Sequence, residues 1–169
     1  MSSEPVALTL VGPSDAELLA NLLELYIHDL SDVFAHPELG PNGRFGYPYL
    51  PLYFSEPDRR IACLIRQGSR ALGFILVTRG SPVLEDVDVH DVAEFFVVRR
   101  YRRSGVGRQA AMLLWRQFPG KWSVRVSEGN PRALAFWTQV VAEYTAGDAS
   151  ESLRPGDPHA WRVFYFEKS

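Results

Sequence analysis

The sequence contains one cysteine, four histidines and no apolar run of about 18 residues or more. The lack of such a run argues against a membrane-spanning helix, and the N-terminal residues lack the basic and apolar regions of a signal peptide. We therefore expect a cytoplasmic protein without a membrane partner. Cys63 cannot form an internal disulfide, and its apolar neighbours predict a buried structural thiol rather than a nucleophile. No His or Cys spacing is typical of a metal site, so no metal is expected.

An excess of positive charge is also missing. The chain has 18 Lys and Arg against 20 Asp and Glu, a net charge of −2, so we expect no general binding of nucleic acid. Any basic function must be local. The length of 169 residues, with 46% hydrophobic and 22% charged residues, is ordinary for a single domain over residues 1–169 with a substantial core. We expect a monomer or a homodimer.

The spacing of apolar residues predicts alternating strands and helices. Strands are expected at residues 6–11, 61–66, 71–79, 92–98, 122–127 and 160–168, and helices at 14–30, 106–118 and 130–141. Ser14 and Glu17 predict a capping box at the first helix, and Asn130 with Pro131 predicts the start of the last one. Residues 31–58, rich in proline, glycine and aromatics, predict a loop or short helical turns. This order predicts a mixed α/β sheet with helices on its faces.

The stretch EFFVVRRYRRSGVGRQAAMLLW, residues 94–115, is the most informative part of the chain. It leads from an apolar strand through five arginines, Gly105 and Gly107 into a helix. The first turn of a helix has unpaired N–H groups and a positive dipole end, glycines let a phosphate approach the backbone, and arginines add charge-assisted bonds. The stretch therefore predicts a phosphate cradle; a turn with solvated arginines is the alternative.

Two known phosphate loops do not fit. The Walker pattern requires Lys-Ser/Thr after its second glycine, where this chain has Arg108-Gln109. The segment GVGRQA satisfies the dinucleotide pattern with Ala110, but only about 60 residues follow it, too few for the usual dinucleotide-binding arrangement.

A third pattern fits better. The segment VVRRYRRSGVGRQAAMLL resembles the acetyl-coenzyme A loop of the GCN5-related N-acetyltransferase (GNAT) superfamily, Gln/Arg-x-x-Gly-x-Gly/Ala after a central strand, with Arg102, Gly105 and Gly107 in the matching positions. Asn130 and Ala133 match the family's second landmark in NPRALAFW. The resemblance implies a mixed, mostly antiparallel twisted sheet of about six to seven strands flanked by helices. It also implies acetyl-coenzyme A as acyl donor and an N-acetyltransferase acting on a primary amine of a small molecule or peptide.

The resemblance assigns the cofactor site residue by residue. The backbone N–H groups of residues 103–108 would hold the pyrophosphate, with Arg103 and Arg108 as side-chain ligands. Val97 and Val98 would pair with the pantetheine arm like an added strand, and Asn130 would bind the same arm. The cofactor-binding residues implied are Val97, Val98, Arg102, Arg103, Ser104, Gly105, Val106, Gly107, Arg108, Asn130, Ala133 and Trp137.

The catalytic residues are less well marked. Glu94 precedes the loop on its strand, where some family members place a catalytic glutamate, and it is either the base or a carboxylate satisfied by a neighbouring arginine. In many relatives the acid that protonates the leaving thiolate is a tyrosine seven residues after the asparagine, but this chain has Trp137 at that position. Tyr144 is our candidate for the acid; other tyrosines, or solvent, are alternatives.

The acceptor site is expected among residues 26–56, which resemble an uncharacterised subgroup of predicted acetyltransferases sharing Tyr-x-x-Asp and Gly-Tyr-Pro-Tyr segments. Tyr26, Asp29, Tyr47 and Tyr49 are the candidates, since aromatic rings and a carboxylate suit a cationic amine. Aromatic side chains packed under a long loop are the alternative. Two other function classes remain: a coenzyme A-binding sensor without catalysis, which Trp137 favours, and a nucleic-acid binder using RRYRRSGVGR, which the acidic remainder disfavours.

Overall fold

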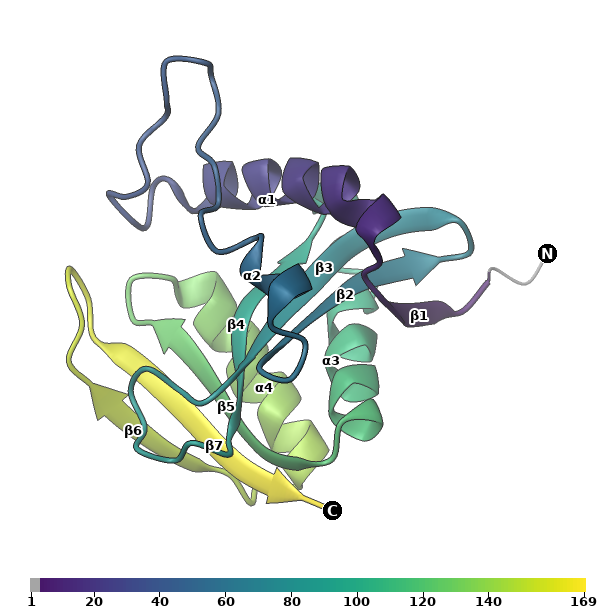
Figure 1. The fold of residues 1–169 in the computed structure, drawn as a ribbon. Helices are drawn as coiled ribbons and strands as arrows, with labels where there is room; N and C mark the ends of the chain where they lie inside the picture. Colours follow the sequence, from purple (N-terminus) through teal and green to yellow (C-terminus); the bar gives the residue numbers. More distant parts are fainter. Residues whose placement is uncertain (1–3) are drawn as a thin grey trace. The chain divides into compact units, whose positions relative to one another are not determined.

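The computed structural model describes residues 4–169 and contains seven strands and four α-helices over that range (Figure 1). The strands are β1 (Val6–Leu10), β2 (Arg60–Gln67), β3 (Arg70–Arg79), β4 (His90–Val97), β5 (Gly120–Ser127), β6 (Ser150–Arg154) and β7 (Trp161–Lys168). The helices are α1 (Ala16–Leu30), α2 (Leu52–Ser55), α3 (Val106–Gln117) and α4 (Pro131–Thr145). Short 3₁₀ turns lie at Pro13–Asp15 and Arg99–Tyr101.

The strands form one sheet in the order β1-β2-β3-β4-β5-β7-β6. β1 pairs antiparallel with β2, and β7 pairs antiparallel with both β5 and β6. β4 and β5 are parallel, with His90–Val92 opposite Trp122–Val124. The predicted mixed, mostly antiparallel sheet of about six to seven strands flanked by helices is therefore confirmed.

The chain groups into two compact units, which are described separately. The first contains the described residues up to Leu76 together with Glu94–Gly107, and the second contains Val77–Ala93 and Arg108–Ser169. In the first unit, α1 lies across β2 and β3 (Figure 1). Its apolar face, including Leu19 and Leu23, packs with Leu64, Phe74 and Phe96. This packing explains the 3.6-residue apolar spacing of α1 and the continuous apolar character of β2 and β3.

The core of the second unit is aromatic. Trp115 on α3 is 1% exposed, and its ring centroid lies 5.0 Å from that of Phe166 on β7 and 6.2 Å from that of Trp137 on α4. Trp122 on β5 is fully buried, and its indole N–H donates to the Phe118 carbonyl at 2.8 Å. These contacts attach α3 and α4 to the β5–β7 part of the sheet.

Two sequence predictions differ from the structure. The capping box at Ser14 and Glu17 is wrong, because a 3₁₀ turn precedes α1 and the Asp15 carboxylate instead accepts the Gly12 N–H at 3.1 Å. β6 was not predicted, since its sequence SESLR is polar and mostly exposed. The cap of α4 is confirmed, with the Asn130 side chain accepting the Ala133 N–H at 3.2 Å. Within residues 4–169, no helix combines the length and apolar character needed to span a membrane.

Candidate active site

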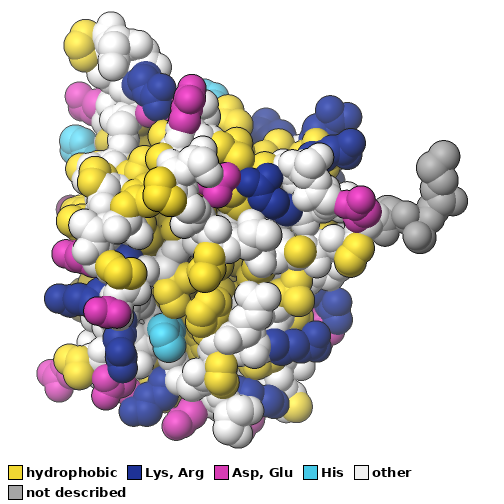
Figure 2. All heavy atoms as spheres, turned by 45° about the vertical axis from the view of Figure 1, so that its right-hand side comes forward, with side chains coloured by type: hydrophobic (Ala, Val, Ile, Leu, Met, Phe, Trp, Pro, Cys, Tyr) yellow, Lys and Arg dark blue, Asp and Glu magenta, His cyan; other side chains and the backbone are white. Residues whose placement is uncertain are grey.

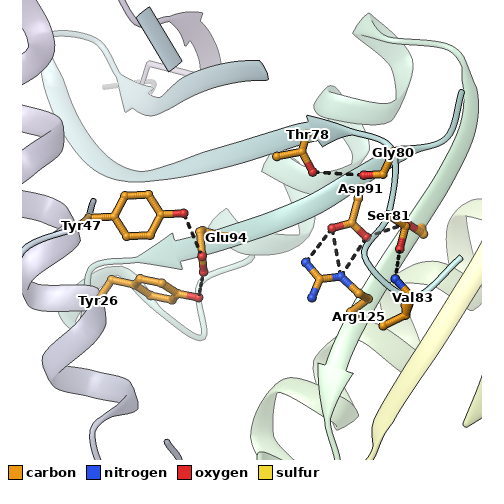
Figure 3. Close-up of polar contacts among 10 residues, drawn as sticks. Tyr26, Tyr47, Thr78, Gly80, Ser81, Val83, Asp91, Glu94 and Arg125 are labelled. Carbon is orange, nitrogen blue, oxygen red and sulfur yellow. Dashed lines mark hydrogen bonds and ion pairs between the residues drawn. The ribbon is translucent and has the colours of Figure 1, made fainter. Parts of the chain in front are cut away.

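The first unit brings a carboxylate and two phenols together. Glu94 lies half-buried on β4. Its Oε2 accepts a hydrogen bond from the Tyr26 hydroxyl of α1 at 2.5 Å, and its Oε1 accepts one from the Tyr47 hydroxyl at 3.1 Å (Figure 3). Tyr26 is fixed by edge-to-face packing on Phe74, with ring centroids 5.6 Å apart. Two predicted acceptor-site residues and the predicted base therefore form one cluster.

Tyr47 and Tyr53 remain protonated at neutral pH. Burial, and then the negative charge of Glu94, raises the pKa of Tyr47 far above its usual range. Burial raises the pKa of Tyr53 to about 12, and the charge of Glu94 adds to this shift, so Tyr53 belongs to the same cluster. The Tyr53 side chain is buried, and its hydroxyl has no hydrogen-bond partner among residues 4–169. Tyr49 is exposed, with its ring edge-on to Tyr47 at 5.8 Å.

A residue that the sequence analysis missed holds Tyr47 in place. Glu24 on α1 accepts the backbone N–H groups of Phe45 and Gly46 at 2.8 and 2.9 Å, and it lies 3.4 Å from the Arg44 guanidinium. These bonds join an irregular segment to the helix that also carries Tyr26. The sequence offered no local signal for this role, because the partners of Glu24 lie 21 and 22 residues away.

The strand end after Glu94 leads into a loop with left-handed backbone. The Val98 N–H donates to the Leu72 carbonyl at 2.8 Å, which ties the end of β4 to β3. Arg103 and Gly105 then have φ angles of 62° and 83°, and α3 begins at Val106. Backbone with alternating hand points successive N–H groups toward one side, a geometry that suits an anion. The Ser104 hydroxyl donates to the Tyr101 carbonyl at 2.8 Å within this loop.

The arginines of the loop differ in their partners. Arg99 Nη2 binds Asp29 Oδ1 at 2.8 Å, and Arg102 Nη2 binds the other oxygen of the same carboxylate. Arg100 lies over the ring of Tyr101, 5.6 Å from its centroid. Asp29, a predicted amine ligand, is therefore already paired with two arginines.

The two arginines predicted as phosphate ligands also differ. Arg103 is exposed and forms no ion pair within residues 4–169. Arg108, in the second unit, binds Glu143 with Nε at 2.8 Å and with Nη2. The hydrogen bond and charge of Glu143 raise the pKa of Arg108 above its usual value. Arg103 is thus free to bind an anion, whereas Arg108 would first have to leave Glu143.

Asn130 and Tyr144 lie at opposite ends of α4. Asn130 caps the N-terminus, and Tyr144 is fourteen residues further on, about 21 Å along the helix axis at 1.5 Å per residue. Tyr144 packs on Trp115 with ring centroids 4.9 Å apart, and Lys168 Nζ lies 5.5 Å from its ring centroid. Trp137 is buried against Trp115. The structure therefore does not bring the predicted acid, Tyr144, to the end of the helix where Asn130 was predicted to bind the cofactor.

A second buried carboxylate lies on β4. Asp91 is fully buried (Figure 3). Its carboxylate accepts hydrogen bonds from Ser123 Oγ at 2.6 Å and from Arg125 Nε and Nη2 at 3.0 and 2.8 Å. Asp91 is therefore a carboxylate satisfied by an arginine, the environment that the sequence analysis considered as the alternative for Glu94. Both oxygens of the Asp91 carboxylate accept hydrogen bonds from β5, so we interpret Asp91 as a structural link between β4 and β5. No group of His, Cys, Asp or Glu in residues 4–169 could hold a metal ion.

The family model of the acetyltransferase (GNAT) family matches residues 20–141, which is more than half of the chain. The chain belongs to this family. No curated protein sequence matches it. Solved GNAT structures cover almost all of it at low identity. An acetyltransferase from Thermus thermophilus has a TM-score of 0.70 at 18% identity, and the match covers 99% of this chain and 99% of that one.

Two further structures of similar fold contain ligands. Spermidine N-acetyltransferase from Vibrio cholerae, in complex with CoA and spermine, has a TM-score of 0.66 at 11% identity over 96% of this chain and 95% of that one. Arabidopsis thaliana NAA60, in complex with a bisubstrate analogue, has a TM-score of 0.60 at 13% identity over 96% and 98%. At these identities the likenesses establish the fold.

Proposed function

We propose that the chain is an acetyl-coenzyme A-dependent N-acetyltransferase that acts on a primary amine of a small molecule or peptide. One observation carries the proposal: Glu94, a half-buried carboxylate held by two phenols, lies on the strand that runs directly into the loop of Arg102, Gly105 and Gly107. A base and an anion cradle thus follow each other along the chain. Family membership supplies the reaction class.

The loop fits a phosphorylated cofactor. Arg103 and Gly105 have positive φ, so the backbone N–H groups entering α3 suit a pyrophosphate, and Arg103 has a guanidinium without an ion pair among residues 4–169. We propose these groups as the diphosphate site, with Val97 and Val98 for the pantetheine arm. The bound cofactor would supply the acetyl group. We keep Arg108 as a ligand only if Glu143 releases it.

Glu94 would act as the base. An amine must lose a proton to attack the acetyl carbon, and a carboxylate oriented by Tyr26 and Tyr47 is suited to take that proton. The C–N bond then forms, the C–S bond breaks, Glu94 takes the proton of the amine, and the leaving thiolate is protonated. Because Tyr144 lies far from Asn130 along α4, we assign that last proton to solvent, which a thiol pKa near 8.5 permits.

The acceptor site would be formed by Tyr26, Tyr47 and Tyr49. Their rings offer faces to a cation, and Glu94 offers its charge. A nucleic-acid role finds no support: positive and negative side chains are intermingled on the face seen in Figure 2, and Asp29 and Glu143 neutralise arginines of the loop. The remaining alternative is a coenzyme A-binding sensor without turnover, which a lack of thiol release with any amine would favour.

The test is calorimetric titration with acetyl-coenzyme A, followed by a thiol-release screen over primary amines. Gly105→Trp should abolish binding while the protein stays folded. Gly147→Trp is the matched control, because Gly147 has a φ of 82° against 83° for Gly105, yet it follows α4 outside the loop. Equal binding by the wild type and Gly105→Trp would contradict the loop assignment. No binding by the wild type would reject the function.

A further inference from the structure

Asp29 lies at the last turn of α1, where its carboxylate bridges two arginines of the loop. Its side chain is 17% exposed, and its two oxygens bind different residues, Arg99 and Arg102. Arg99 stands in the 3₁₀ turn directly after β4, and Arg102 stands at its end. One carboxylate therefore holds both ends of the turn that precedes the left-handed residues Arg103 and Gly105.

The side chain of Arg102 makes three contacts in this arrangement. Nε donates to the Val97 carbonyl at 2.7 Å, Nη2 binds Asp29, and the guanidinium carbon lies 5.5 Å from the ring centroid of Phe96. The guanidinium thus faces back onto its own strand and α1. These three contacts fix the direction of the Arg102 side chain at the start of the loop.

We propose that Asp29 is a positioning residue for the coenzyme A loop, which it presets through Arg99 and Arg102, rather than a ligand of the acceptor amine. The proposal rests on the proposed function for the identity of the anion. It also assigns Arg102 a structural role in the loop and leaves Arg103 as the side chain that faces the phosphate.

The electrostatics of Asp29 agree with this role. Burial alone would raise the pKa of Asp29, but the hydrogen bonds and charges of Arg102 and Arg99 outweigh it and lower the pKa below its usual value. The carboxylate is therefore charged and satisfied throughout the neutral range. A third cation, the ammonium of an acceptor, would find its charge already compensated by two guanidinium groups.

The experiment compares Asp29→Asn with Asp32→Asn, which removes an exposed carboxylate from the same end of α1. Amide hydrogen exchange of residues 98–105 is measured in the ligand-free proteins, and calorimetry then gives the Kd for coenzyme A. We expect Asp29→Asn to speed exchange in the loop and to raise Kd about fivefold, since two partly exposed ion pairs are lost. Asp32→Asn should change neither quantity.

The outcomes separate this inference from the proposed function. Unchanged loop exchange in Asp29→Asn would overturn the inference whether or not coenzyme A binds. A raised KM for the amine, with unchanged loop exchange and unchanged Kd for coenzyme A, would restore Asp29 as an acceptor ligand. Faster loop exchange in a protein that binds no coenzyme A would support the positioning role and reject the cofactor. Asp29→Glu, which keeps the charge, should recover part of the wild-type affinity.

Discussion

The phenol oxygen of Tyr26 lies 2.5 Å from Oε2 of Glu94, and this hydrogen bond joins α1 to β4. Tyr47 occupies the other carboxylate oxygen from an irregular segment. The two phenols thus orient the carboxylate through both of its oxygens. A general base must be held in a fixed orientation.

Glu94→Gln tests the base. The amide cannot take a proton from an amine, so kcat/KM should fall about 100-fold near neutral pH. The deficit should shrink as pH rises, because an alkylamine with a pKa near 10.4 then loses its proton without help. Rates of thiol release between about pH 6.5 and 9.5 measure this. Glu167→Gln removes an exposed glutamate on β7 and serves as control. A constant ratio to wild type at every pH would assign Glu94 a structural role.

Glu24→Ala tests how Tyr47 is held. Loss of the carboxylate leaves the N–H groups of Phe45 and Gly46 without their partner, so the segment should become more mobile. We expect faster amide exchange at these two residues and an amine KM raised about fivefold, with coenzyme A affinity unchanged. Glu38→Ala, in an exposed part of the same segment, controls for loss of charge. An amine KM equal to wild type would mean that Tyr47 does not contact the acceptor.

The elements that could be predicted from the sequence are those with local determinants. Asn130 and Pro131 define the start of α4 within one turn, and Gly105 provides a positive φ directly before α3. β6 lacks such a signal: only Ser152 in SESLR is even half-buried, and the strand exists because it pairs with β7. A polar edge strand has no apolar alternation to detect.

The site was predictable only in part, for the same reason. The sequence indicated Glu94, Tyr26 and Tyr47 as separate candidates, but their bonds span 68 and 47 residues. The partners of Asp29 are likewise distant in sequence, so its pairing with Arg99 and Arg102 could not be read from the residue types. A carboxylate near aromatics predicts attraction to a cation, but it does not reveal whether that cation belongs to a substrate or to the chain itself.

Gly73→Ala tests the close approach of β3 to β4. A Cβ at Gly73 would lie 1.9 Å from the Phe96 carbonyl oxygen and 3.0 Å from Val97 Cα, so the strand after Glu94 would have to shift. We expect a loss of about 2 kcal/mol in unfolding free energy and a Tm lower by about 4–8 °C. Thermal unfolding followed by circular dichroism measures it. Gly12→Ala is the control, since its φ is −97° and its nearest neighbour would lie 3.9 Å away. Equal melting of the two variants would contradict the packing at Gly73.

Tyr53→Phe tests the environment of the cluster around Glu94. The buried Tyr53 hydroxyl has no hydrogen-bond partner within residues 4–169, so its removal should leave stability at about pH 8 unchanged or raise it by about 1 kcal/mol.

Burial and the charge of Glu94 raise the pKa of Tyr53 to about 12. The unfolded chain therefore releases this proton near pH 10 and the folded chain near pH 12, so wild-type stability falls across that window. The advantage of Tyr53→Phe over wild type should then grow by about 2.3 kcal/mol between about pH 9 and 12, as measured by urea unfolding at each pH. An advantage that stays constant over this range would show that the Tyr53 hydroxyl is solvated, and that Glu94 lies in a wetter site than its bonds to Tyr26 and Tyr47 indicate.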